Sequence, residues 1–239
     1  MSLRAESPRT AAGSASAERY VVKDFRGSSH RLLAAWVGEL PPGARLLELG
    51  SGTGQIARLA GRPDLDWRGL EGSLGGLGPL AELLAGGAIV DLDVLPRLPR
   101  GFDAALAADV LEHLNDPERM LAHLREALPA GAPLLISVPN VANLAVRVAL
   151  LFGRFDYAER GILDRTHRIF FTRRSLDRML LSAGFRIERR TASAVPLRLA
   201  LSGWPDWLLT PLEALVELLA RLRPTLFGFQ LLALARRAP

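Results

Sequence analysis

Short apolar runs alternate with segments of helical periodicity through the middle of this chain, from residue 45 to residue 138. Strand, helix, strand order of this kind needs crossover connections, and these place neighbouring strands parallel to one another. The pattern therefore predicts an α/β fold built on a doubly wound, mostly parallel sheet. The runs predict strands at 45–49, 65–70, 88–92, 102–107 and 133–138 and helices at 53–60, 77–84 and 117–128.

Elements are also expected on both sides of this stretch. A helical pattern over 28–40 stops at Pro41-Pro42-Gly43, which punctuates a helix end. Thr172 can cap a helix that Gly184 ends. Two further strands are expected at 185–190 and 229–235, and an amphipathic helix rich in tryptophan and leucine at about 205–222.

The composition is that of a folded protein and excludes several classes of site. Hydrophobic residues make up 49% of the 239 residues and charged residues 23%. Residues 1–18 are rich in Ala, Ser and Arg, so we expect a disordered tail before a single domain at 19–239. We find no secretory signal and no apolar run of membrane-spanning length. The absence of cysteine excludes disulfides and thiolate metal sites and fits a reducing cytoplasm.

The positive charge of the chain is almost all arginine. The net charge is +5 with a pI near 10.7, and Lys23 is the single lysine. Arginine suits phosphate and carboxylate partners. A codon bias toward arginine explains the same composition, and net charge bears on association rather than on fold. We therefore expect no nucleic-acid partner.

A glycine-rich loop follows the first strand of the alternation. The run from Leu46 to Gly54 reads Leu-Leu-Glu-Leu-Gly-Ser-Gly-Thr-Gly, and its glycines let the backbone approach a ligand closely. A tight turn alone would use the same residues. Glu71, however, ends the next strand, where an acid commonly binds the ribose hydroxyls of an adenosine. Loop and acid together indicate a nucleoside-containing ligand.

Charge then narrows the choice of ligand. The loop is G-x-G-x-G and lacks both the dinucleotide pattern G-x-G-x-x-G and the Gly-Lys-Ser/Thr ending of a P-loop. Glu48, two residues before the first glycine, would repel a pyrophosphate but would attract an ammonium and a sulphonium. S-adenosylmethionine carries both cations and is the predicted cofactor.

These motifs resemble the class I S-adenosylmethionine-dependent methyltransferases. The resemblance rests on the glycine loop, on Leu70-Glu71-Gly72, and on the Asp109-Val-Leu-Glu-His-Leu114 run after the fourth predicted strand. It is closest to bacterial members with Ser137-Val-Pro-Asn140 after the fifth strand, many of which serve cell-surface glycan pathways. The family implies a Rossmann-like sheet of seven strands whose last strand is antiparallel.

The resemblance also implies a set of cofactor-binding residues. Glu48 and the glycine loop correspond to the residues that bind the methionine end of the cofactor in this family. Glu71 corresponds to the residue that binds the ribose. Asp91 is preferred as the acid near the adenine, although Asp93 lies two residues on and would face the same way in an extended segment. Asp109 resembles the wall against the methionine, with a turn residue as the alternative. The full set is Glu48, Gly50, Ser51, Gly52, Gly54, Gln55, Glu71, Gly72, Asp91, Leu92, Asp109 and Val110.

Two histidines are candidates for catalysis. A sulphonium is already an activated methyl donor, so an acceptor must mainly be aligned and, if it is a hydroxyl, lose a proton. His113 follows the fourth strand at the ligand-binding end of the sheet, and His167 lies in the polar connection at 153–171. A structural role in a turn or a surface loop is the alternative for each. A metal site is not expected, because Asp164 and His167 supply too few ligands.

The acceptor is the least constrained part of the hypothesis. The family resemblance implies a hydroxyl on a sugar or lipid-linked glycan, with a small quinone-precursor-like hydroxyl as the runner-up. A noncatalytic S-adenosylmethionine-binding protein would keep the same fold. The helix at 205–222 would pack its apolar face on the sheet or on a second copy in a homodimer. Alternatively, its tryptophans and Arg221 and Arg223 would lie at an anionic lipid surface as a peripheral membrane contact on the cytoplasmic side.

Overall fold

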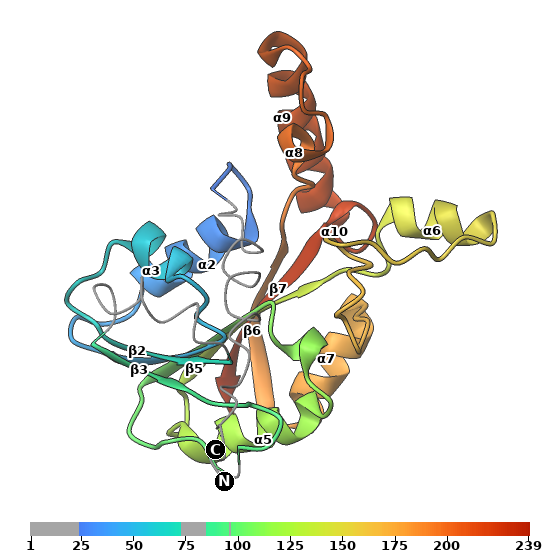
Figure 1. Ribbon diagram of the computed structural model, residues 1–239. Helices are drawn as coiled ribbons and strands as arrows, with labels where there is room; N and C mark the ends of the chain where they lie inside the picture. Colours follow the sequence, from blue (N-terminus) through green and yellow to red (C-terminus); the bar gives the residue numbers. More distant parts are fainter. Residues whose placement is uncertain (1–23, 73–84, 96) are drawn as a thin grey trace, which may run out of the picture.

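The computed structural model describes residues 24–72, 85–95 and 97–239, with a central sheet and helices on both of its faces (Figure 1). The predicted tail at 1–18 and the predicted helix at 77–84 lie outside these residues. In chain order the elements are α2 (Ser29–Gly38), β1 (Arg45–Leu49), α3 (Gln55–Ala60), β2 (Asp66–Glu71), β3 (Gly86–Ile89), β4 (Ala104–Ala108), η1 (Leu111–His113), α5 (Pro117–Ala127), β5 (Pro133–Pro139), α6 (Leu144–Leu151), α7 (Arg173–Ser182), β6 (Phe185–Ala192), α8 (Leu197–Ala200), α9 (Asp206–Leu222), α10 (Pro224–Phe227) and β7 (Gln230–Arg237).

The sheet has the strand order β3-β2-β1-β4-β5-β7-β6. Among the described strands only β7 is antiparallel to its neighbours, β5 and β6. The strand order reverses between β1 and β4, since the chain first moves outward to β3 and then returns to the other side of β1. Such a reversal leaves a ligand-binding crevice at the carboxyl ends of the two strands. The predictions of seven strands, double winding and an antiparallel last strand are confirmed.

Apolar side chains are buried on both faces of the sheet, which explains why its strands read as continuous apolar runs. Successive residues of β1 point to opposite faces, so that Leu46 joins one buried cluster and Leu47 the other. The first cluster includes α2 and α3 through Leu33, Val37 and Ile56. The second includes α5 and α7 through Leu121, Leu124, Leu176 and Leu180.

Two predicted helix starts are confirmed by their caps. The side chain of Asp116 accepts a hydrogen bond from the Arg119 N–H, and Pro117 occupies the first turn of α5. At α7, Thr172 and Ser175 form a reciprocal capping box. These caps fix where α5 and α7 begin, and therefore the lengths of the loops that precede them at the ligand-binding end of the sheet.

The sequence did not indicate α6, α8, α10 or η1. Three of these elements have only three or four residues, too few for a helical period to be visible. Helix α6 reads Leu-Ala-Val-Arg-Val-Ala-Leu-Leu and is apolar on nearly every side, so it shows no amphipathic pattern.

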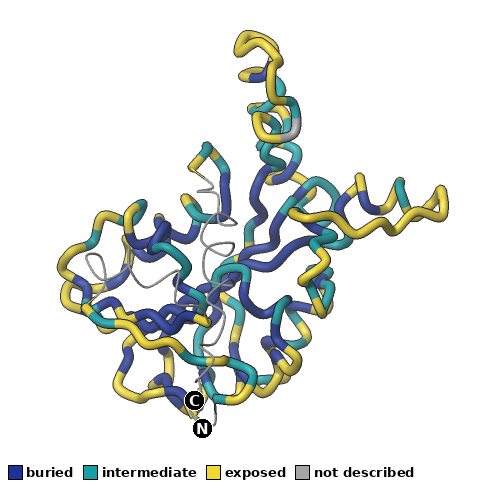
Figure 2. Tube along the Cα trace, in the orientation of Figure 1, coloured by how far each residue is buried: buried dark blue, intermediate teal, exposed yellow. Residues whose placement is uncertain are grey.

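Helix α9 extends away from the sheet together with α8, and α6 extends separately (Figure 1). The expectation that the sheet covers the apolar face of α9 is wrong: Trp207 is 73% exposed and Leu222 65% exposed (Figure 2). Within α9 only Leu209 and Ala220 are buried. The predicted polar face is present, with Glu217 and Arg221 paired at 2.5 Å. In the single chain, most of the apolar face of α9 therefore meets solvent.

Candidate cofactor and acceptor site

The glycine loop joins β1 to α3 at the strand-order reversal. Gly50, Gly52 and Gly54 all have left-handed backbone conformations, with φ of 62°, 53° and 71°. A Cβ on Gly50 would lie 2.5 Å from Cγ2 of Val110, so the loop can pass the end of β4 only as glycine. A Cβ on Gly52 would meet nothing within 4 Å. The described residues thus leave space in front of the middle of the loop.

Glu71 holds this loop in place from the end of β2. Glu71 is 6% exposed, and its Oε2 accepts a hydrogen bond of 2.7 Å from the Gly52 N–H. The Gly50 N–H donates in turn to the Leu70 carbonyl at 2.7 Å. Glu71 and the glycine loop, which the sequence predicts to bind one ligand together, are therefore in direct contact.

Glu48 lies deeper than the sequence argument assumed. It is 2% exposed, and its Oε2 accepts a 2.8 Å hydrogen bond from Nε1 of Trp67. Burial raises the pKa of Glu48; the hydrogen bond from Trp67 opposes this rise and the nearby Glu71 adds to it, so that the pKa lies at about 8. Glu48 is consequently protonated at neutral pH in the ligand-free chain, and attracts a cation only when that cation displaces its proton.

The two acids after β3 have different surroundings. Residues 92–94 form a turn rather than an extended segment, so the premise that Asp91 and Asp93 face the same way is wrong. Asp93 accepts hydrogen bonds of 2.8 Å from both the backbone N–H and the side-chain amide of Asn115. Asp91 is exposed and accepts from the backbone of Asp93 at 2.9 Å. Asp91 thus has the more accessible carboxylate of the two.

Asp109 has a positive φ of 55°, the only one among the described non-glycine residues. Its N–H donates to the Ser137 carbonyl at 3.0 Å, and the Ser137 hydroxyl donates to its Oδ1 at 2.7 Å. Gln230 on β7 donates to Oδ2. A conformation that is costly for a side-chain-bearing residue is therefore fixed from β5 and β7. A simple turn residue would not need these two side-chain contacts from other strands.

The remaining predicted residues differ in how deeply they are buried. Ser51 and Gln55 are buried at 5% and 8% exposure, the latter at the start of α3. Val110 is buried against Gly50. Gly72 is exposed directly after β2, and Leu92 packs on the edge of the core in the turn after β3.

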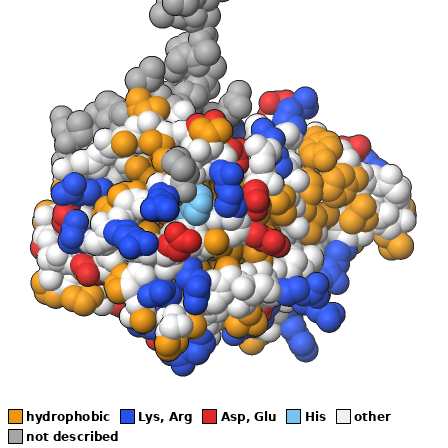
Figure 3. All heavy atoms as spheres, turned by 90° about the horizontal axis from the view of Figure 1, so that it is seen from below, with side chains coloured by type: hydrophobic (Ala, Val, Ile, Leu, Met, Phe, Trp, Pro, Cys, Tyr) orange, Lys and Arg blue, Asp and Glu red, His pale blue; other side chains and the backbone are white. Residues whose placement is uncertain are grey.

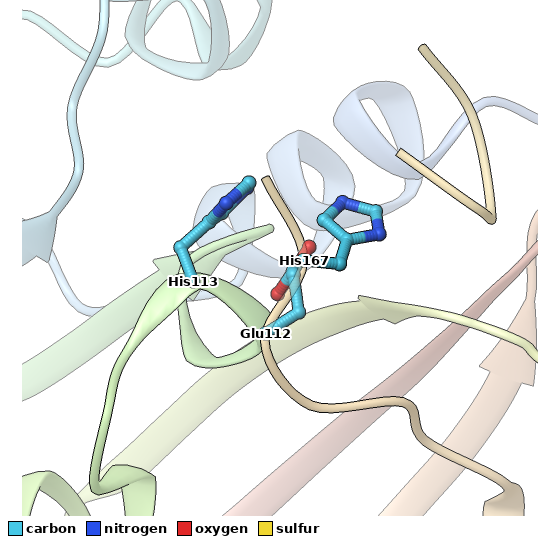
Figure 4. Close-up of side chains that lie close together, drawn as sticks. All are labelled: Glu112, His113 and His167. Atoms are coloured by element: carbon cyan, nitrogen blue, oxygen red, sulfur yellow. The ribbon is translucent and has the colours of Figure 1, made fainter. Parts of the chain in front are cut away.

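His113 and His167 come together although 53 residues separate them in the sequence. Their ring centroids lie 4.9 Å apart, with the planes inclined at 67°. Glu112 joins them: one ligand atom from each of the three residues lies within 4.8 Å of the other two (Figure 4). The loop is pinned at this point, because the N–H groups of Arg168 and Ile169 donate to the Glu112 carbonyl at 2.8 and 3.2 Å. Glu112 was not predicted from the sequence, because only the path of the 153–171 connection in the fold brings His167 to it.

Backbone carbonyls set the tautomers of both histidines. Nδ1 of His113 lies 3.3 Å from the Thr166 carbonyl, and Nδ1 of His167 lies 3.0 Å from the Ile162 carbonyl. A carbonyl oxygen only accepts hydrogen bonds, so each Nδ1 carries the hydrogen, and in a neutral ring of this tautomer Nε2 keeps a lone pair. Burial lowers the pKa of His167 and favours its neutral form.

An apolar groove lies between α6, α9 and α10. Its volume is about 680 Å³, and Arg154 at the start of the 153–171 connection contributes to its wall. Hydrophobic side chains also gather on the right of the molecule in Figure 3, the side to which α6 extends in Figure 1. Besides Arg154, the groove is lined by Asn143, Leu144, Ala145, Val148, Ala149, Phe152, Val195, Val216, Leu219, Leu226 and Phe227.

One connection links the groove to the histidines. Residues 153–171 contain no helix or strand, only isolated bridges from Ala158 to Asp164 and from Asn140 to Phe171. The segment contributes Arg154 to the groove and His167 to the histidine cluster. No helix in the described part of the chain is both long and apolar enough to cross a membrane.

Comparisons with known proteins agree with this geometry. A family model described as a methyltransferase domain matches residues 19–189, more than half of the chain. No curated protein sequence matches. Among solved structures, the chain resembles an S-adenosylmethionine-dependent methyltransferase from Mesorhizobium loti with 20% identity and a TM-score of 0.58, covering 87% of this chain and 98% of that chain.

Other structural neighbours carry different activities on the same fold. Magnesium protoporphyrin IX methyltransferase from Synechocystis, solved with bound SAH, has 16% identity and a TM-score of 0.57, with 88% of this chain and 82% of that chain covered. The [4+2]-cyclase SpnF has 23% identity and a TM-score of 0.57, with 87% and 80% covered. At such identities the likeness shows the fold, and the reaction must be argued from the site and the family.

Proposed function

The chain belongs to the methyltransferase-domain family and takes its methyl group from S-adenosylmethionine, and we propose that its acceptor is a hydroxyl of a sugar in a lipid-linked glycan. The observation that carries this proposal is the connection at 153–171, which contributes both to a histidine cluster and to an apolar groove. A hydroxyl acceptor uses the cluster, and a lipid chain uses the groove.

We assign the cofactor to the crevice between β1 and β4. The glycine loop supplies backbone N–H groups and open space at Gly52, and Glu71 lies where the ribose would be bound. Asp91 would take the adenine end, and Asp109 with Val110 would form the wall beside the methionine. With the cofactor bound in this way, the transferable methyl group would lie near the carboxyl end of β4, shortly before η1.

The histidine cluster then lies on the acceptor side. Methyl transfer needs the acceptor oxygen in line with the sulphonium, and a hydroxyl must give up its proton as the new bond forms. Burial lowers the pKa of His167 and so favours its neutral form, in which Nε2 has a lone pair that would receive that proton directly. His113 lies against it and would orient the same hydroxyl.

The apolar groove and the two extended helices support a lipid-linked acceptor. A groove of about 680 Å³ falls in the size range of ligand sites, roughly 300 to 1,000 Å³. Leu151 and Phe152 at the end of α6 are 80% and 76% exposed, and Trp207 on α9 is 73% exposed. Exposed aromatic and aliphatic side chains on extended helices favour peripheral contact with a membrane, where such an acceptor resides.

A panel of acceptors tests the proposal by measuring S-adenosylhomocysteine formation. The panel comprises a polyprenyl-phosphate-linked sugar, the same sugar without lipid, and a quinone-precursor-like phenol. We expect kcat/KM to fall at least tenfold when the lipid is removed, since each buried methylene contributes about 0.8 kcal/mol. Preference for the phenol would favour a small-molecule methyltransferase. Cofactor binding without turnover on any acceptor would favour a noncatalytic binding protein.

Matched surface variants separate the groove from general effects of exposed apolar residues. Phe152→Ser should lower activity on the lipid-linked sugar but not on the free sugar, because Phe152 lines the groove. Leu181→Ser on α7 is the control, since Leu181 is also exposed, at 56%, but does not line the groove. Equal effects of the two variants would contradict the assignment of the groove. Sedimentation showing a dimer that Phe152→Ser dissociates would instead assign the groove to a second copy of the chain.

A further inference from the structure

Glu112, His113 and His167 form a compact group of nitrogen and oxygen donors at the carboxyl end of β4, and we propose that they bind a divalent transition-metal ion. One donor atom from each residue lies within 4.8 Å of the other two. In the view of Figure 4 the two imidazoles and the carboxylate lie close to one another, with η1 supplying Glu112 and His113 and the 153–171 connection supplying His167. No other group of this kind occurs among the described residues.

The spacing is close to what an ion requires. Bonds from zinc to histidine nitrogen and carboxylate oxygen are about 2.0 to 2.2 Å long, so two ligand atoms on one ion are at most about 4.2 Å apart. A donor separation at the 4.8 Å limit would therefore have to shorten by at least about 0.6 Å, which small side-chain rotations supply. The backbone itself needs no rearrangement, because the Arg168 and Ile169 N–H groups already fix the connection to the Glu112 carbonyl.

Both imidazoles have the tautomer that a metal ligand needs. Histidine ligands usually donate the hydrogen of the second ring nitrogen to a backbone carbonyl or carboxylate, which fixes the ring and raises its basicity. Here Nδ1 of His113 faces the Thr166 carbonyl at 3.3 Å, and Nδ1 of His167 faces the Ile162 carbonyl at 3.0 Å. Each ring consequently keeps Nε2 for an ion, and the carbonyls hold both rings in orientation.

The donor set selects the kind of ion. Two imidazoles and one carboxylate suit zinc and its first-row neighbours, whereas magnesium and calcium prefer oxygen donors throughout. Three protein ligands leave at least one coordination position for a small oxygen ligand. The site thus has the composition of an open metal site rather than of a closed structural one.

An ion in this position would act on the acceptor hydroxyl, a step that rests on the proposed function. A bound dication lowers the pKa of a coordinated water from 15.7 to about 7, and an alcohol responds in the same direction. The acceptor oxygen, having lost its proton to solvent, attacks the methyl carbon while the bond from sulphur to that carbon breaks. The products are the methyl ether, S-adenosylhomocysteine and one proton. With the ion bound, the two histidines serve as ligands and solvent takes the proton, so the ion replaces the proton-accepting role that His167 has in the metal-free site.

Metal binding can be measured without cofactor or acceptor. The full chain, stripped with a chelator and dialysed, is titrated calorimetrically with Zn²⁺ and separately with Mg²⁺, and Co²⁺ is added to record its visible absorption. We expect one Zn²⁺ per chain, affinity for Mg²⁺ at least tenfold weaker, and a Co²⁺ spectrum of low coordination number. Because no acceptor is present, an error in the proposed acceptor cannot affect this result.

Variants locate the ion within the chain. Glu112→Gln preserves the shape of a residue that is 1% exposed, and His167→Ala tests a half-buried ligand from the other element. Each should weaken Zn²⁺ binding at least tenfold, with circular dichroism confirming the fold. His123→Ala, on α5, is the matched control and should leave the affinity unchanged. Zn²⁺ affinity that neither ligand variant alters would overturn the site.

Activity then separates the ion from the methyl transfer. With an acceptor that turns over, the metal-stripped enzyme should lose at least nine-tenths of its rate and regain it on addition of Zn²⁺. Full activity in the stripped enzyme would overturn the role of the ion in catalysis and return His167 to the role of general base. Absence of turnover on every acceptor, with Zn²⁺ binding intact, would reject the proposed function and leave the metal site standing.

Discussion

Replacement of Glu48 by glutamine should stabilise the fold, and by a larger amount as the pH rises. Burial raises the pKa of this carboxyl from its ordinary 4.5 to about 8. Between these pH values the folded chain keeps a proton that the unfolded chain has released, so the free energy of unfolding falls by about 1.4 kcal/mol per pH unit. Over the whole interval of about 3.5 pH units the loss reaches about 5 kcal/mol, and above pH 8 it is complete. Glutamine has no proton to lose and keeps the shape of the neutral acid.

Urea unfolding of the wild type and Glu48→Gln at pH 5, 6.5 and 8 measures this difference. The advantage of the variant should be small at pH 5 and grow steadily to pH 8. Glu39→Gln is the control: hydrogen bonds from Arg189 lower the pKa of Glu39, so this carboxylate contributes stability that is lost as the pH falls. The control should therefore be less stable than the wild type near neutrality. A pH-independent difference between Glu48→Gln and wild type would refute the burial argument.

Four further substitutions probe the crevice and the acceptor side. Glu71→Gln should weaken S-adenosylmethionine binding by about 10- to 150-fold in calorimetry, since a charge-assisted hydrogen bond contributes roughly 1.5 to 3 kcal/mol. Gly50→Ala should lower the urea midpoint, because its Cβ would meet Val110 at 2.5 Å, whereas Gly52→Val should chiefly abolish cofactor binding by filling open space. His167→Ala should reduce turnover about a hundredfold with cofactor affinity unchanged. Unaltered cofactor binding in the Glu71 or Gly52 variant, an unaltered midpoint in the Gly50 variant, or full turnover in the His167 variant would contradict the respective assignment.

The architecture could be predicted from the sequence because the central strands β1, β4, β5 and β7 are buried along most of their length. Such strands are continuous apolar runs, and the helices between them carry their own start and stop signals, as at Thr172 and Gly184. Prediction from sequence periodicity reaches its limit at α6 and α9. The apolar residues of α6 show no helical period. Periodicity identified the apolar face of α9 but contains no information on what covers it, and in the single chain most of that face is exposed.

Some residues of the candidate site could likewise be predicted from the sequence, and others could not. Gly52 and Glu71 could be paired from the sequence because they lie at or just after the ends of two successive strands that are side by side in the sheet. Gln230 was missed, since only the antiparallel return of β7 brings it to Asp109, 121 residues earlier. The approach of His167 to Glu112 likewise depends on backbone hydrogen bonds within an irregular connection, for which the sequence offers no period.

The protonation of Glu48 also connects the fold to the cofactor. If the methionine end of S-adenosylmethionine lies against Glu48, as the resemblance implies, its positive charge favours the carboxylate, and binding below pH 8 must release a proton. Affinity should then rise with pH by up to about tenfold per unit and level off above pH 8, since one proton is exchanged per cofactor bound. Calorimetry in two buffers of different ionisation enthalpy counts that proton, and Glu48→Gln should release none. Binding of equal strength at pH 6 and pH 8 in the wild type would mean that Glu48 stays protonated beside Trp67 and serves the fold alone.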